Sequence, residues 1–189
     1  MNFLEQQLKE AGFFQHGIAD TADIRFSQEV RAMCEVNTCR KYGTTWACPP
    51  AVGTVEECKE RIQQYEKMLV FTGKYDLEDS FDFEGMMASA KQFAMSCRSF
   101  DTAVKPYLNQ YLMLANEGCD LCKECTYPDA PCRFPDRMHV SLEANGIFVN
   151  ELAKLAQVNY HNGANTVTYF GALVCSADDL KPLENLEAK

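Results

Sequence analysis

Four cysteines in the segment 118–135 follow the spacing C-x2-C-x2-C-x6-C. They are Cys119, Cys122, Cys125 and Cys132. A tight loop can deliver three thiolates to three iron corners of a cubane cluster, and a fourth thiolate then returns from further along the chain. Cys132 is placed to do this because residues 127–131 (YPDAP) can form a turn before it. The spacing therefore predicts a [4Fe-4S] site in this segment.

Two other interpretations of the same cysteines compete with an iron–sulfur cluster. Structural zinc prefers two separate Cys-x2-Cys knuckles, whereas here the middle cysteine would belong to two overlapping knuckles. Disulfides persist mainly in secreted proteins, and the first residues, MNFLEQQLKEAGFF, do not resemble a secretion signal. The sequence thus favours a metal over disulfides, with zinc as the alternative to iron and sulfide.

Another group of cysteines occupies the segment 33–50; we call it the first group, and the cysteines of 118–135 the second group. The members of the first group are Cys34, Cys39 and Cys48. Trp46 and Tyr42 stand beside them, and Pro49 and Pro50 hold the chain rigid and extended after the last cysteine. We interpret these thiols as metal ligands, with the indole and phenol rings walling the site, although buried cysteines of a core-lining loop are the alternative. Three thiolates on a four-iron cluster would leave one iron open to a substrate.

The other residues that could do chemistry have no comparable context. Cys58, Cys97 and Cys175 lie on apolar stripes or at the end of an apolar strand and are predicted to belong to the core. The three histidines are His16, His139 and His161, and none is singled out by its neighbours. Glu143, soon after the second group, is a candidate acid or a partner of the metal ligands, but it is equally suited to a helix start.

Composition bounds the class of protein. With 189 residues and 47% hydrophobic content, the chain is expected to form one domain, residues 1–189, with its own core. A net charge of -9 argues against binding to nucleic acid or to an anionic membrane surface. No apolar run is long enough for a membrane span. Ten cysteines without an export signal predict a reducing, cytoplasmic location.

Hydrophobic periodicity predicts an α+β fold, or a small three-layer α/β fold, with a few-stranded sheet, packed helices and a cysteine-rich loop. Helices are expected over 2–11, after a capping box at Thr54 and Glu57, and over 83–115 with a break at Pro106. Strands are expected over 68–75 and 166–174. The acidic tail from Ala177 is expected to be loose.

The two cysteine groups together resemble a family of predicted metal-binding proteins of anaerobic bacteria and archaea, domain of unknown function 2284. The first shared motif, C-x4-C-x2-Y-G-x2-W-x-C-P-P, begins at Cys34. The second, C-x2-C-x2-C-x6-C-R-x-P, begins at Cys119 and is followed by S-x-E-A-x-G-I from Ser141. The resemblance covers most of the chain. It implies a metal-binding protein of the iron–sulfur type, whose biochemical activity is unassigned.

Three functions follow as hypotheses. The first is a cytoplasmic [4Fe-4S] protein for redox or electron-transfer chemistry with a redox protein as partner. The second is an enzyme in which a second cluster, held by the three cysteines of 33–50, acts on a small substrate. The third is a zinc-stabilised structural or interaction protein without catalysis. The sequence does not decide whether the protein is an enzyme, and it identifies neither a substrate nor an oligomeric state.

Overall fold

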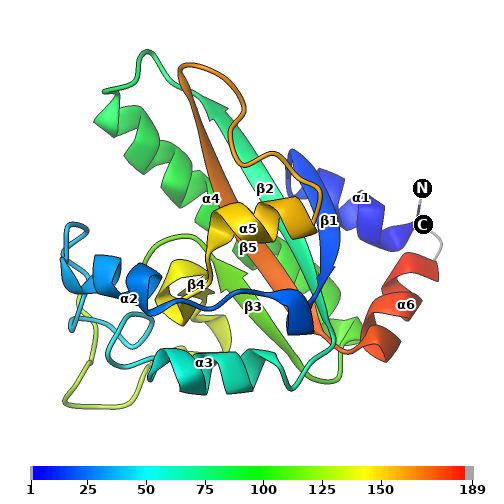
Figure 1. Cartoon of the computed structure of the whole chain (residues 1–189), viewed down its shortest axis with the longest axis horizontal. Coiled ribbons are helices and arrows are strands. Elements are labelled where there is room, and N and C mark those ends of the chain that lie inside the picture. Colours follow the sequence, from blue (N-terminus) through cyan, green and yellow to red (C-terminus); the bar gives the residue numbers. More distant parts are fainter. Residues whose placement is uncertain (1, 186–189) are drawn as a thin grey trace.

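A mixed sheet with the strand order β1-β2-β5-β3-β4 runs through the computed structural model, which describes residues 2–185 (Figure 1). The strands are β1 (Gln15–Asp20), β2 (Lys67–Asp76), β3 (Tyr111–Ala115), β4 (Val140–Ser141) and β5 (Thr166–Cys175). The pairs β1–β2, β2–β5 and β5–β3 are antiparallel, and only β3–β4 is parallel within this sheet. The two long central strands, β2 and β5, pair along their whole length.

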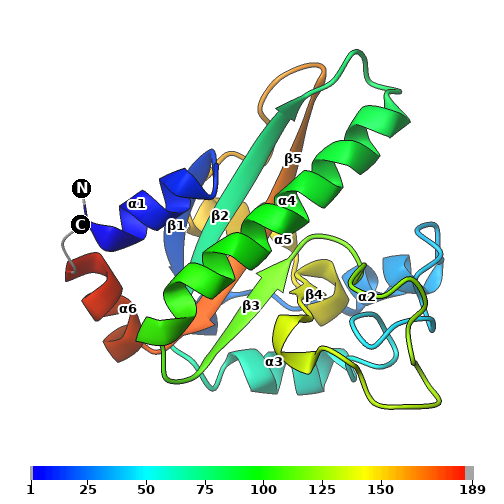
Figure 2. The same cartoon turned by 180° about the vertical axis from the view of Figure 1, so that it is seen from behind.

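Helices cover both faces of the sheet (Figure 2). The α-helices are α1 (Phe3–Glu10), α2 (Gln28–Glu35), α3 (Val55–Ile62), α4 (Phe83–Val104), α5 (Val149–Leu155) and α6 (Ala177–Asn185). Short 3-10 helices are η1 (Thr21–Asp23), η2 (Lys105–Tyr107), η3 (Pro135–Arg137) and η4 (Glu143–Asn145). Side chains of β2 alternate between the faces, so Leu69 and Phe71 pack towards α1, α4 and α6, whereas Met68 and Val70 pack towards α3 and α5. The α+β prediction is confirmed.

Several predicted elements are present. The strands expected over 68–75 and 166–174 are β2 and β5. The capping box at Thr54 is also confirmed, because Thr54 Oγ1 accepts the Glu57 amide and the Glu57 carboxylate accepts the Thr54 amide. α1 ends just before Gly12, whose φ of 78° is the left-handed conformation that favours glycine after a helix.

Two predictions were wrong. The helix expected over 83–115 ends at Val104, and residues 111–115 form the strand β3 between β5 and β4. Pairing with β5 outweighs the weak helical spacing of this short segment. The tail expected to be loose forms α6 instead, because Leu180 and Leu183 are buried in the core beside α1. The part of that tail at 186–189 lies outside the described residues.

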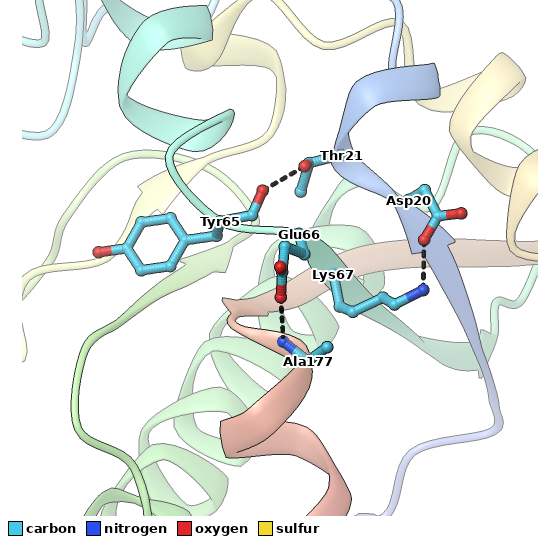
Figure 3. Close-up of polar contacts among 6 residues, drawn as sticks. All are labelled: Asp20, Thr21, Tyr65, Glu66, Lys67 and Ala177. Atoms are coloured by element: carbon cyan, nitrogen blue, oxygen red, sulfur yellow. Dashed lines mark hydrogen bonds and ion pairs between the residues drawn. The ribbon is translucent and has the colours of Figure 1, made fainter.

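Polar contacts join the start of β2 to its neighbours (Figure 3). The Thr21 hydroxyl donates to the Tyr65 carbonyl, and the Asp20 carboxylate lies 2.5 Å from Lys67 Nζ. The Glu66 carboxylate accepts the backbone amide of Ala177 at 2.7 Å and so caps the first turn of α6. These contacts fix the end of the sheet at which α6 begins.

The aromatic cluster between β2 and α4 gives the first testable prediction. Phe71 is 0% exposed and its ring stacks on that of Phe13 at 4.2 Å. Phe71→Ala should lower the free energy of unfolding by about 3–5 kcal/mol because it leaves a cavity. Phe81→Ala is the matched control, since Phe81 is 79% exposed and should change stability by no more than about 0.5 kcal/mol. Urea unfolding measures both, and equal losses would contradict the assigned core.

Candidate metal centre

The four cysteines of the segment 118–135 line a single small cavity. Its walls contain Cys119, Cys122, Cys125 and Cys132, together with residues that include Trp46 and Arg133. All four cysteine side chains are partly buried. The cavity measures about 20 Å³, which is room for about one water molecule. Within residues 2–185 the structure groups no three His, Cys, Asp or Glu side chains closely enough to hold a metal ion.

The segment 116–134 has neither helix nor strand, and polar contacts give it its shape. The Thr126 hydroxyl donates to the Pro131 carbonyl at 2.8 Å, across the turn before the last cysteine. The Arg133 guanidinium donates to the Glu124 carbonyl at 2.8 Å. An ion pair of 2.9 Å between Arg98 and Asp120 fastens the segment to α4. These bonds hold the turn in place without using the thiols, which therefore remain available as ligands.

Trp46 joins the two cysteine segments. Its indole N–H donates to the Ala130 carbonyl at 3.0 Å, and its ring meets the edge of Tyr127 with centroids 4.9 Å apart. The indole thus forms a wall of the cavity of the other segment. Tyr42, which was expected to wall the first group, lies in the turn after α2, where its backbone amide donates to the Asn37 side chain at 3.0 Å. Its phenol ring is not among the groups lining the cavity.

The segment that carries the first group reaches the second group. Cys34 is in the last turn of α2, Cys39 is exposed and Cys48 is 7% exposed. A side chain at Gly118 would place its Cβ 3.0 Å from the Cys48 sulfur, so the two segments are in direct contact at this point. The segments 33–50 and 118–135 accordingly lie at the same end of the molecule (Figure 1).

Burial changes the acidity of the thiols. Desolvation raises the pKa of Cys34, Cys48 and Cys119 above the ordinary value of a thiol. Neighbouring thiols add to the effect, since Cys39 raises the pKa of both Cys34 and Cys48, and Cys119 raises that of Cys48. Thiols with raised pKa hold their protons at neutral pH, and a metal must displace those protons in order to bind.

Arg31 is a site residue that the sequence did not single out. It is 6% exposed, and its guanidinium donates to the carbonyls of Gly53 and Ala144 at 2.6 Å each. Within residues 2–185 it forms no ion pair, and its Nε has no hydrogen-bond partner. A buried cation needs compensating negative charge. Arg31 lowers the pKa of Cys34, so a thiolate there would supply that charge.

The signal for Arg31 was present in the sequence. It precedes Cys34 by three residues on a helix, which places the two side chains on one face of α2. Glu143 approaches the same cysteine from η4, where it raises the pKa of the Cys34 thiol.

The other three cysteines are in the core, as predicted. Cys58, Cys97 and Cys175 are each 0% exposed. Cys97 and Cys175 belong to the apolar cluster between the sheet and α4. The Cys58 sulfur accepts a hydrogen bond from the Arg31 guanidinium at 3.6 Å. Cys58 thus contacts Arg31 and is not one of the cysteines of the first group. Cys97 and Cys175, which lie away from both cysteine groups, serve as matched controls for the candidate ligands.

Comparison with known proteins gives one family. Its sequence profile, described as "Predicted metal-binding protein (DUF2284)", matches residues 17–175. The matched range includes both cysteine segments and runs from β1 to the end of β5. No curated protein and no solved structure matches the chain. In the part of the chain that the structure describes, no helix is long and apolar enough to cross a membrane.

The loop cysteines line the cavity, and the core cysteines do not. Cys122→Ala should remove the metal bound in the second segment, because one of the four thiols around the cavity is lost. Cys97→Ala should leave metal content unchanged. Elemental analysis of the two variants after purification without oxygen measures the difference. If Cys97→Ala strips metal as completely as Cys122→Ala, the ligand assignment is wrong.

The raised thiol pKa values predict how metal binding depends on pH. Each thiol must release its proton before it can bind as a thiolate, so metal affinity should fall as the pH is lowered from about 8 to about 6. Competition with a metal indicator at a series of pH values measures this slope. An affinity that does not change over the range would mean that ligands other than Cys34, Cys48 and Cys119 dominate binding.

Proposed function

Because the chain belongs to this family of predicted metal-binding proteins, DUF2284, we propose that it holds a [4Fe-4S] cluster in the loop 119–132 and transfers electrons. The observation that carries the proposal is the single cavity lined by four thiols. Four thiolates would saturate the irons of a cluster, which when bound supplies one-electron redox chemistry. The part-buried cysteines of this surface loop would leave such a group within reach of a redox protein.

Residues around the cavity suit a negatively charged group. Arg133 lines the cavity and is oriented by its hydrogen bond to Glu124. A cation beside an iron–sulfur cluster offsets its charge and raises its reduction potential. All ten cysteines are free thiols in the structure, which supports the proposal of a reducing location such as the cytoplasm.

The small size of the cavity supports zinc as a second candidate. With room for about one water molecule, the space would have to widen for a multi-atom cluster, whereas a single zinc ion would draw the four thiols together. Zinc would then contribute to folding, and the protein would have no redox role. The overlapping Cys-x2-Cys spacing still favours iron and sulfide over zinc.

The first cysteine group supports a third candidate, an enzyme with a second metal centre. Arg31 is buried and forms no ion pair with a carboxylate in the described part of the chain, so it would balance the negative charge of thiolates that hold a metal at Cys34, Cys39 and Cys48. Three protein thiolates would leave a coordination position for a small substrate. Glu143, whose charge acts on the Cys34 thiol, would be an acid close to that position.

Elemental analysis separates these functions. Iron, zinc and acid-labile sulfide should be measured per chain on protein purified without oxygen. About four irons and four sulfides support the single electron-transfer cluster, and about eight of each support a second cluster at the first group. Zinc without sulfide would exclude both iron–sulfur functions, the electron-transfer cluster and the second cluster at the first group. A structural zinc protein would then be the remaining function.

The role of Arg31 can be tested separately. Arg31→Met should weaken metal retention at the first group about 10–100-fold, as loss of a group behind metal ligands typically does. Arg25→Met is the matched control, because Arg25 is exposed and pairs with Glu151 away from the cysteines. Chelator challenge followed by metal analysis gives the retention. Equal retention in the two variants would remove Arg31 from the site.

A further inference from the structure

A buried network of acid, histidine and tyrosine lies outside the two cysteine segments. The Asp101 carboxylate, on α4, accepts the Tyr111 hydroxyl at 2.6 Å and lies 3.0 Å from Nε2 of His139. The His139 and Asp101 side chains are 8% and 10% exposed. Burial and the hydrogen bond to Asp101 raise the pKa of Tyr111, so its hydroxyl stays protonated and keeps donating. The network brings together α4, β3 and the chain that follows η3.

The three residues line a cavity of about 380 Å³, a size typical of small-molecule sites. Apolar side chains form much of its wall: Leu112, Leu114, Met138 and Val140. The carboxylate of Asp101 is already engaged by two partners. Nδ1 of His139, in contrast, has no hydrogen-bond partner among residues 2–185. The ring is therefore held by Asp101 on one side and has a free nitrogen for a ligand on the other.

The charges that line this cavity are unusual for an acidic protein. Arg61 and Lys105 both line it, and neither forms an ion pair within the described part of the chain. Arg61 is oriented by a hydrogen bond of 2.8 Å to the Val52 carbonyl. Asp136 also lines the cavity, and its carboxylate forms no hydrogen bond with Tyr111 or His139. With Asp101 counted, the wall holds two cations and two carboxylates, but among the described residues neither cation forms an ion pair with them. Arg61 and Lys105 therefore remain available to an anionic ligand, in a chain whose net charge is -9.

A neighbouring cavity lies beside the candidate metal loop. Arg61, Met138 and Val140 also line a neighbouring cavity of about 560 Å³. The walls of that second cavity include Trp46 and Cys132. The two cavities are therefore neighbours, with Arg61, Met138 and Val140 as a shared wall.

We propose that the cavity beside His139 binds a small organic carboxylate with an apolar body. Arg61 and Lys105 pair with the carboxylate group, Nδ1 of His139 forms a further hydrogen bond to it, and the leucines, Met138 and Val140 contact the apolar body. A network that merely fastened α4 to the loop would not require unpaired cations around an open cavity. The proposal rests on protein groups alone, so it can fail or hold whichever metal the cysteines bind.

Calorimetric titration of the full chain with benzoate tests the proposal. Benzoate should bind saturably, while benzamide, its neutral analogue, and inorganic phosphate, which lacks an apolar body, should bind at least about tenfold more weakly. Arg61→Gln and His139→Gln should each weaken benzoate binding by a similar factor. Arg25→Gln is the control and should bind benzoate as the unaltered protein does.

Arg61→Gln keeps the test decisive if His139→Gln disturbs folding, because the Arg61 side chain is only partly buried. Thermal unfolding of each variant shows whether it is folded. Absence of benzoate binding, equal binding of benzamide or phosphate, or undiminished binding by folded Arg61→Gln would overturn the proposal. Metal and sulfide content, measured on the same samples, reports on the cluster independently.

Discussion

The packing of segment 33–50 onto segment 118–135 is the contact on which the candidate centre depends. Neither segment has an apolar core of its own, and the second contains no helix or strand between residues 116 and 134. Trp46 joins them by a hydrogen bond to Ala130 and an edge contact with Tyr127. The Cys48 sulfur lies against Gly118, where an added Cβ would be only 3.0 Å from it and would push the two segments slightly apart. The sheet supplies the anchors, since the second segment leaves from β3 and returns to the parallel neighbour β4.

Charge is the second constraint on this region. Burial raises the pKa of the Cys34 and Cys48 thiols, while Arg31 is a buried cation that forms no ion pair with a carboxylate of residues 2–185. A bound metal would exchange the protons for positive charge and leave thiolates beside the guanidinium. Metal binding and local folding would therefore be coupled, as is usual for loops with few apolar contacts.

The sequence predicted the parts of the structure that depend on local patterns. The spacing of Cys119, Cys122, Cys125 and Cys132 predicted one metal site; the four line one cavity, and their role as metal ligands stays a prediction. Apolar stripes placed Cys58 and Cys97 in the core, and both are fully buried. Where partners are distant in the chain, local patterns were insufficient. Residues 111–115 are a strand because of β5, and His139 meets Asp101 only through the fold.

Anomalous X-ray diffraction at the iron and zinc edges, from crystals grown without oxygen, tests the central claim most directly. The account predicts an iron signal enclosed by Cys119, Cys122, Cys125 and Cys132, beside the indole of Trp46. A zinc signal alone at that position would contradict the redox function and retain the site. Metal bound elsewhere, with these four cysteines free, would contradict the site itself.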